Sequence, residues 1–289
     1  GLQPTSVAIS FSKNIAIANK ESIICAWNLI LKSLKKNNTN FIPVDSEHFS
    51  IWSLINKTHF NKTKNNMIEK IFITASGGPF LNWPLNKNKN AKPSSALNHP
   101  NWSMGKKISI DSATLMNKVF EVIEAQRIFN IPMSKFKILI HPNSYVHAMI
   151  QFKNGLNKIL THDTNMQIPI FNTIYNNSDK TIKTKKINLN LLNNLNFSDV
   201  NTKKFPSVKI LTKISNKVTL FETILVTAND ELVKLYLQKK IKFNQIVSTL
   251  LKIITLSEFS KYKRKLPKNV SEINHLHNYV RLKTNSLCI

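Results

Sequence analysis

The strongest constraint on the fold is an alternation of short apolar segments with one amphipathic segment at the front of the chain. Asn14 to Ala18 is typical of a strand, and from about Glu21 the apolar residues recur at helical spacing. Phe41 to Val44 and Lys70 to Ala75 are again typical of strands. Strand, helix and strand in this order predict a parallel sheet, so we expect an α/β fold.

A polar cluster follows each of the two later strands. Asp45-Ser46-Glu47-His48 follows the first, and Ser76-Gly77-Gly78-Pro79 follows the second. Ligands of parallel sheets bind outside the carboxyl ends of the strands. The two clusters are therefore the first candidates for a binding site.

Between Pro79 and Gly105 the chain has several prolines and little hydrophobic periodicity. A connection of this length without regular structure is uncommon in a compact domain, and it is often a lid over a functional site. We therefore predict a lid. Its end, from His99 to Gly105, contains Trp102, which suits a mobile aromatic cover about as well as a core position.

The next regular segment is predicted to be a helix that begins near Ser112, after Asp111, and continues to about Phe129. Strands are predicted beyond it, and their ranges are Phe136 to Ile140, Tyr145 to Phe152 and Leu156 to Leu160, the last two joined as a hairpin at Asn154-Gly155. Residues 176 to 204 are rich in Asn and Lys and are predicted to form a linker. After Phe205-Pro206 the pattern predicts a small helical bundle.

The net charge of +26 is of the kind found in proteins that bind nucleic acid, because clustered cations release counterions from a phosphate backbone. Here only Arg127, Arg264 and Arg281 are arginine, so lysine carries nearly all the positive charge. Nucleic-acid readers rely on arginine for bidentate contacts. We therefore interpret the lysines as mostly solvated and predict no nucleic-acid partner, with a lysine-rich nucleic-acid-binding protein kept as a minor alternative.

No run of about 18 apolar residues occurs, and the N-terminus lacks the order of a secretory signal. We expect a cytoplasmic protein, or one of an organelle stroma in a plastid-bearing source, with no membrane partner. Cys25 and Cys288 lie at opposite ends of the chain, without the spacing of a metal site or a disulfide framework. They are expected to be reduced thiols.

The few acidic residues carry more information. Asp45 and Glu47 stand two residues apart at a strand end, so both carboxylates can point to one side, as a Mg²⁺ or Mn²⁺ ion requires. Taken alone, such a pair is more often a helix cap or a solvated turn. In the following helix, Asn117, Glu121, Glu124 and Ile128 follow one stripe with Lys118 beside Glu121, which makes a metal site more favourable.

A phosphate site rests on different groups. Ser112 at a helix N-terminus, with Asn117, Lys118 and the Ser76-Gly77-Gly78 loop, would offer hydroxyl, amide, ammonium and backbone donors. The alternative for Ser112 alone is an ordinary helix cap. Lys20 is interpreted as a surface lysine or, since it follows a strand, as a substrate contact; His99 could be an ordinary loop residue, whereas His141 and His147 are interpreted as structural.

Five motifs together resemble, in order and spacing, those of the deoxyxylulose phosphate reductoisomerases. They are Ala18-Asn19-Lys20-Glu21-Ser22; Pro43-Val44-Asp45-Ser46-Glu47-His48; Ser76-Gly77-Gly78-Pro79-Phe80; His99 to Gly105; and Asp111-Ser112-Ala113-Thr114 with Met116-Asn117-Lys118 and Glu121. The resemblance covers the chain to about Thr173. It continues more weakly through Phe205-Pro206 and Thr227-Ala228-Asn229.

The resemblance implies an enzyme of the non-mevalonate isoprenoid pathway that rearranges and reduces 1-deoxy-D-xylulose 5-phosphate to 2-C-methyl-D-erythritol 4-phosphate with NADPH and Mn²⁺ or Mg²⁺. By similarity, Asp45, Glu47 and Glu121 would hold the metal, and Asn19, Glu21 and Gly105 would border NADPH. The substrate site would consist of Lys20, Ser46, Glu47, Ser76, His99, Trp102, Ser112, Asn117, Lys118 and Glu121, with the phosphate at Ser76, Ser112, Asn117 and Lys118. Catalytic roles would fall to Lys20, Glu47, His99 and Glu121, in a homodimer.

One departure from the family pattern concerns NADPH. The only glycines are Gly1, Gly77, Gly78, Gly105 and Gly155, so no GxGxxG fingerprint occurs, and the first residue is not Met. We therefore predict a fragment that lacks most of the N-terminal NADPH-binding domain, or else a catalytically inactive remnant. The predicted fold is α/β (α+β): the end of a Rossmann-like parallel-sheet domain (1–44), an α/β catalytic domain with a lid (45–175), a linker (176–204) and a C-terminal helical domain (205–289).

Overall fold

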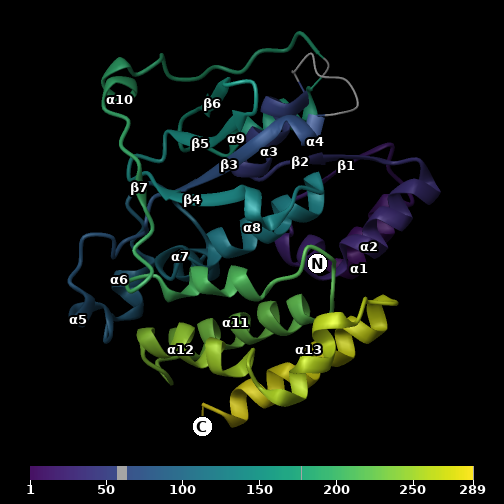
Figure 1. Ribbon diagram of the computed structural model, residues 1–289, viewed down its shortest axis with the longest axis vertical. Coiled ribbons are helices and arrows are strands. Elements are labelled where there is room, and N and C mark those ends of the chain that lie inside the picture. Colours follow the sequence, from purple (N-terminus) through teal and green to yellow (C-terminus); the bar gives the residue numbers. More distant parts are fainter. Residues whose placement is uncertain (57–63, 177, 289) are drawn as a thin grey trace.

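The computed structural model describes residues 1–56, 64–176 and 178–288 (Figure 1). Its first part consists of α1 (Leu2–Ile9), β1 (Asn14–Ile17), α2 (Lys20–Asn37) and β2 (Asn40–Pro43). β1 and β2 pair in parallel, and α2 buries Ile23, Trp27 and Ile30 beside them. The predicted strand, helix and strand at the front of the chain are confirmed.

A second, mixed sheet forms the middle of the molecule, in the order β6-β5-β3-β4-β7. The strands are β3 (Ile68–Ala75), β4 (Phe136–Ile140), β5 (Val146–Phe152), β6 (Asn157–Thr161) and β7 (Ser198–Asp199). β3 pairs in parallel with β4 and antiparallel with β5. β3 is buried along most of its length and takes neighbours on both sides, whereas β2 pairs with β1 alone among the described strands, so the strands that precede the two polar clusters belong to different sheets.

The helix predicted to begin at Ser112 was placed wrongly. Two helices occupy this region, α7 (Lys106–Ala113) and α8 (Met116–Phe129), and Ser112 lies in the last turn of α7. Leu115 separates them in the left-handed conformation, with φ of 61°, and is itself 1% exposed. A buried leucine with positive φ is a strained position that only tertiary packing holds, so local sequence could not indicate it.

α8 lies between the two large hydrophobic cores. Val119, Phe120 and Ile123 pack with the C-terminal helices, whereas Val122 and Ala125 pack under the mixed sheet. In Figure 1, α8 accordingly separates the sheet from α11, α12 and α13. A helix buried on nearly all sides holds its polar side chains in fixed positions, which suits it to carry a site.

Only part of the predicted lid is free of packing. α3 (Ser46–Asn56) and α4 (Lys64–Met67) precede it, and α5 (Leu85–Asn88) and α6 (Pro93–Leu97) lie within it. Phe80, Ala91 and Ala96 are buried in the core that includes the C-terminal helices, and the Tyr236 hydroxyl donates to the Ala91 carbonyl over 2.9 Å. The segment from His99 to Gly105 contains no helix and is the part that can act as a lid.

The remaining described elements are largely helical. They are η1 (Met133–Lys135), α9 (Gln167–Ile174), α10 (Leu189–Asn193), η2 (Pro206–Lys213), α11 (Phe221–Leu237), α12 (Phe243–Ile253), η3 (Ser257–Arg264) and α13 (Val270–Ser286). The predicted C-terminal bundle is thus present. The predicted linker is irregular apart from α10 and β7, and β7 pairs with β4. The domain boundaries at 44, 175 and 204 stay predictions.

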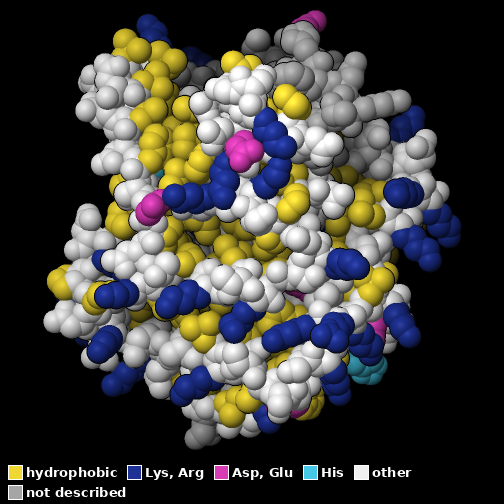
Figure 2. All heavy atoms as spheres, viewed as in Figure 1, with side chains coloured by type: hydrophobic (Ala, Val, Ile, Leu, Met, Phe, Trp, Pro, Cys, Tyr) yellow, Lys and Arg dark blue, Asp and Glu magenta, His cyan; other side chains and the backbone are white. Residues whose placement is uncertain are grey.

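The surface shows no single basic stripe on the face in Figure 2, where lysine and arginine side chains are scattered among polar and apolar ones. No described helix is both long and apolar enough to cross a membrane. Cys25 and Cys288 are both free thiols, as expected.

Candidate active site

Three carboxylates converge at the centre of the site. Asp45 directly precedes α3, Glu47 lies in the first turn of α3, and Glu121 lies on α8. One carboxylate oxygen from each residue lies within 4.8 Å of the others. The convergence agrees with the sequence prediction, but the local reason differs: Asp45 and Glu47 meet at the start of a helix, where the Asp45 carboxylate accepts from the Glu47 backbone N–H over 3.3 Å.

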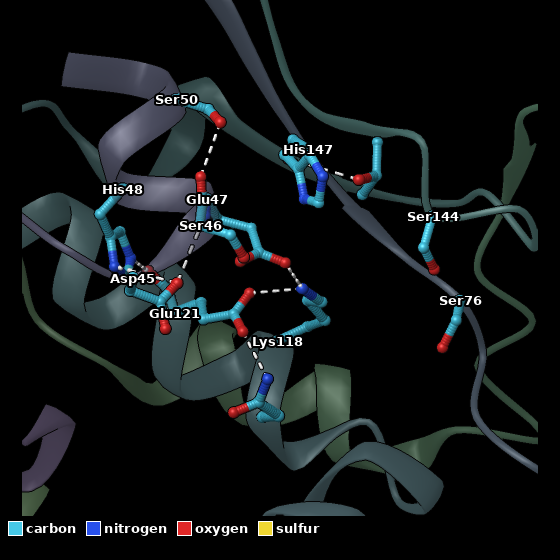
Figure 3. Close-up of polar contacts among 12 residues, drawn as sticks. Asp45, Ser46, Glu47, His48, Ser50, Ser76, Lys118, Glu121, Ser144 and His147 are labelled. Atoms are coloured by element: carbon cyan, nitrogen blue, oxygen red, sulfur yellow. Dashed lines mark hydrogen bonds and ion pairs between the residues drawn. The ribbon is translucent and has the colours of Figure 1, made fainter. Parts of the chain in front are cut away.

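Two lysines reach this cluster. Lys118 Nζ lies between Glu47 and Glu121, in contact with the first and 2.7 Å from Oε2 of the second (Figure 3). Lys20 Nζ contacts Asp45 and is 3.9 Å from an oxygen of Glu121. Burial lowers the pKa of each ammonium, but the surrounding carboxylates outweigh it and raise both pKa values above the ordinary range. Both lysines are therefore charged, and Lys20 is a site residue and not a surface one.

The carboxylates themselves have unequal proton affinities. Burial and then the charge of Glu47 raise the pKa of Glu121 to about 8. Burial also raises the pKa of Glu47. The pKa of Asp45 is lowered, because the charge of Lys20 overcomes its burial. Because the pKa of Glu121 is about 8, the cluster carries a proton near neutral pH, which a bound cation would displace.

A second layer lies behind the carboxylates. The His48 ring is fully buried, and its Nε2 donates to the Glu121 carbonyl over 2.8 Å, which leaves Nδ1 without a proton. Nδ1 faces oxygens of Asp45 and Glu124, each 3.5 Å away. Burial lowers the pKa of His48 to about 4, so its ring is neutral, and burial raises the pKa of Glu124. Sequence reasoning placed Glu124 on the stripe but did not assign either residue to the site.

The opposite wall of the site is polar and uncharged. His99 Nδ1 accepts from the backbone N–H groups of Asn101 and Trp102, so its Nε2 carries the proton and donates to Ser76 Oγ over 3.0 Å. Burial lowers the pKa of His99 to about 4. Ser76 Oγ also accepts from the Gly78 N–H over 3.1 Å, so the proton of its own hydroxyl is free for an anion.

Gly78 fits this wall because it has no side chain. Its φ is +66°, and a Cβ there would lie 2.9 Å from the Ser112 carbonyl oxygen. The Ser76-Gly77-Gly78 loop therefore packs directly on the end of α7, which brings Ser76 and Ser112 to the same cavity.

A cavity of about 590 Å³ joins the two walls. It is lined by every predicted metal, substrate and NADPH residue, which are Asn19, Lys20, Glu21, Asp45, Ser46, Glu47, Ser76, His99, Trp102, Gly105, Ser112, Asn117, Lys118 and Glu121. Figure 3 shows Ser76 across an open space from Lys118 and Glu121. The structure thus brings all the predicted residues together, while their individual roles stay predictions.

Several predicted site residues also make contacts that stabilise the fold. Asn19 caps α2 by accepting from the Ser22 backbone N–H over 2.9 Å, and Asn117 donates to Glu121. The Trp102 ring meets the His147 ring edge to face, with centroids 6.1 Å apart. His147, interpreted from sequence as structural, is buried and also borders the cavity. Its place on a strand next to a lid aromatic could not be inferred from local sequence.

Together, fold and site define an α/β protein with an oxygen-rich, lysine-flanked carboxylate cluster beside a polar cavity, an arrangement suited to a hard divalent cation and an anionic ligand. Two family models match the chain: the 1-deoxy-D-xylulose 5-phosphate reductoisomerase C-terminal domain over residues 41–129, and the DXP reductoisomerase C-terminal domain over residues 162–283. These matches cover the carboxylate cluster and most of the C-terminal helices.

Among curated relatives, the 1-deoxy-D-xylulose 5-phosphate reductoisomerase of Pelagibacter ubique is 59% identical over all of this chain and 73% of its own length. That of Wolbachia pipientis is 38% identical over 91% of this chain and 66% of its own. A crystal structure of DOX-P reductoisomerase in complex with NADPH, fosmidomycin and magnesium is 30% identical with a TM-score of 0.89, covering 99% of this chain and 72% of that one. The chain belongs to the 1-deoxy-D-xylulose 5-phosphate reductoisomerase family.

Proposed function

We propose that this chain provides the metal and substrate site of an enzyme that rearranges and reduces 1-deoxy-D-xylulose 5-phosphate to 2-C-methyl-D-erythritol 4-phosphate. The observation that carries the proposal is the convergence of Asp45, Glu47 and Glu121 beside a cavity of about 590 Å³. Family membership supports the reaction type. Cytoplasmic location and a homodimer are part of the same proposal.

The donor set fits Mg²⁺ or Mn²⁺. All three ligand groups are carboxylates, which hard divalent cations prefer, and burial together with the charge of Glu47 raises the pKa of Glu121. A divalent cation would relieve this repulsion. A solved DOX-P reductoisomerase, 28% identical with a TM-score of 0.85, is in complex with magnesium. Bound there, the cation would act as a Lewis acid on substrate oxygens, and NADPH would supply hydride.

The phosphate of the substrate is assigned to Ser76, Ser112, Asn117 and Lys118. Ser76 supports this assignment best, since two N–H groups already donate to its oxygen and leave its proton for an anion. Lys118 contacts Glu47 and Glu121, so its ammonium would lie between the metal ligands and the substrate phosphate. Fosmidomycin in the solved relatives supports a phosphorus-containing ligand at this cavity.

The other residues position the substrate and exclude water. Lys20, held by Asp45, would place a cation beside the substrate oxygens, and neutral His99 would donate a hydrogen bond from Nε2. Trp102 would close over the ligand from the segment between His99 and Gly105. Asn19, Glu21 and Gly105, which border the same cavity, are assigned to the NADPH side.

Calorimetry tests the binding proposal. Mn²⁺ and then fosmidomycin are titrated into the 289-residue chain, and saturable binding of fosmidomycin that requires Mn²⁺ is expected. Turnover is measured as loss of NADPH absorbance with 1-deoxy-D-xylulose 5-phosphate, in a protein that joins this chain to an NADPH-binding domain. If that protein binds both compounds but does not turn over, the inactive-remnant alternative is favoured. Absence of binding would refute the site.

A further inference from the structure

Lys107 forms a second charged centre at the edge of the cavity. Its ammonium lies 2.8 Å from Glu21, 3.1 Å from Asp111 and 3.1 Å from Asp230. Burial lowers the pKa of Lys107, but these three carboxylates outweigh the effect and raise it above the ordinary range. Lys107 is therefore charged throughout the neutral pH range.

The three partners come from three helices. Glu21 lies in the first turn of α2, Asp111 on α7 with Lys107 itself, and Asp230 on α11. The side chain of Asn229, next to Asp230 on α11, joins this network by donating to the Asp111 carboxylate over 2.8 Å. The Thr227-Ala228-Asn229 segment, which resembles the reductoisomerases but has no assigned role, thus reaches the cavity from the C-terminal helices through this network.

Lys107 is close in sequence to two parts of the proposed site. It follows Gly105, the end of the His99 to Gly105 segment, by two residues. Its partner Glu21 follows Lys20, whose ammonium contacts Asp45. One ammonium therefore fixes both the residues that join the lid segment to α7, which form the lid hinge, and the first turn of α2.

We propose that Lys107 is a positioning residue, anchored by Asp230 and Asp111, through which the C-terminal helices hold the lid segment and Lys20 in place for ligand binding. The inference rests on the proposed function for its effect on ligand affinity. Its structural content, that Lys107 orders the lid hinge and the start of α2, does not depend on any ligand.

Three substitutions and one control separate this role from general stability. Lys107→Met removes the ammonium and keeps a linear side chain, Lys107→Arg restores the charge, and Asp230→Asn removes only the negative charge that α11 places beside Lys107. Lys234→Met is the control, because Lys234 pairs with Glu231 over 3.0 Å on the same helix α11 but does not border the cavity.

The first measurement needs no ligand. Amide hydrogen exchange in the unliganded chain should be about tenfold faster around residues 19–22 and 102–107 in Lys107→Met, about threefold faster in Asp230→Asn, and unchanged in α12. Lys107→Arg should restore the slower rates. Equal rates in Lys107→Met and the unaltered chain would overturn the proposal, as would the same acceleration in Lys234→Met.

The second measurement is fosmidomycin affinity at saturating Mn²⁺. Lys107→Met should weaken it about tenfold, with Mn²⁺ affinity changed less than threefold because the three carboxylates are untouched, and Lys107→Arg should recover most of the loss. An unaltered chain that binds neither compound would refute the proposed function, and the exchange data would still decide the role of Lys107. Faster exchange with unchanged fosmidomycin affinity would overturn the functional part of the inference.

Discussion

Glu121→Gln is the sharpest test of the metal site. The substitution keeps the size of the side chain, and the single amide oxygen of Gln can accept from either Asn117 or Lys118, but it removes one of three converging carboxylates. We expect the affinity for Mn²⁺, measured with fosmidomycin present, to fall at least tenfold, which corresponds to about 1.4 kcal/mol. The side chain is 1% exposed, so bulk water cannot easily enter and take the place of the lost carboxylate ligand.

The raised pKa of Glu121 sets the pH dependence of this effect. Burial and then the charge of Glu47 raise that pKa to about 8, so the cluster holds a proton at pH 7 that Mn²⁺ must displace. One pH unit below the pKa, this displacement costs about 1.4 kcal/mol. Because the unprotonated form binds the metal, affinity should rise about tenfold per pH unit up to about pH 8 and then level off.

Calorimetry in two buffers of different ionisation enthalpy measures the displaced proton directly. The unaltered chain should release close to one proton per Mn²⁺ at pH 7, and Glu121→Gln should release far less. Glu124→Gln is the matched control, since Glu124 is on the same helix and 2% exposed but lies outside the three-carboxylate cluster. It should change Mn²⁺ affinity less than threefold.

Two results would refute the reasoning. If Glu121→Gln binds Mn²⁺ as tightly as the unaltered chain, Glu121 is not a ligand. If both substitutions weaken Mn²⁺ equally, the loss reflects a general change in the charge of α8. Circular dichroism of each protein at the working pH confirms that the comparison is made between folded chains.

Three further predictions concern the lid, the core and acid stability. Tryptophan fluorescence should change when fosmidomycin and Mn²⁺ bind, and Trp102→Phe should abolish this change; a response that survives would place the signal at another tryptophan. Glu222→Gln should lower the free energy of unfolding in urea by about 3 to 5 kcal/mol, because it leaves the 1% exposed side chain of Arg127 without its carboxylate partner, whereas Lys137→Met, which breaks an exposed pair with Asp199, should cost less than about 1 kcal/mol. Burial lowers the pKa of His48 to about 4, so at pH values below its ordinary pKa the ring takes up a proton on unfolding, and its contribution to stability is full at pH 7 and is lost as the pH falls towards 4. The unaltered chain should therefore lose about 2 kcal/mol more stability between pH 7 and pH 5 than His48→Gln does, and equal losses would contradict this.

The carboxylate cluster could be predicted from sequence because two independent signals agreed. Asp45 and Glu47 are two residues apart, and Glu121 lies on the polar stripe of a clearly periodic helix. Short apolar strands such as β1 and β4 were also placed nearly to the residue, since apolar runs bounded by polar residues have few other interpretations. The motifs supplied the pairing of these distant segments, which spacing alone could not give.

The parts that could not be predicted depend on contacts between distant segments. Leu115 adopts positive φ because it is buried under the mixed sheet, and no local signal marks that break between α7 and α8. The first part of the predicted lid is held down by Phe243 and Tyr236, far away in the sequence. Lys20 resembles any other lysine in this lysine-rich chain until Asp45 is placed beside it. Local periodicity contains none of this information.

The charges of the site explain why an anionic ligand and a divalent cation would bind there together. When all groups are ionised, the three carboxylates of Asp45, Glu47 and Glu121 exceed the ammonium groups of Lys20 and Lys118 by one negative charge. Near pH 7 the proton held by the cluster brings this net charge close to zero, so the cavity without a cation does not favour a phosphorylated ligand, despite the net charge of +26 on the whole chain. A divalent cation that displaces the proton gives the site a net charge of one positive unit. Phosphate or phosphonate binding is then favoured at short range, where lysines more than a Debye length of about 8 to 10 Å away contribute little, so the cation must bind first or together with the anion.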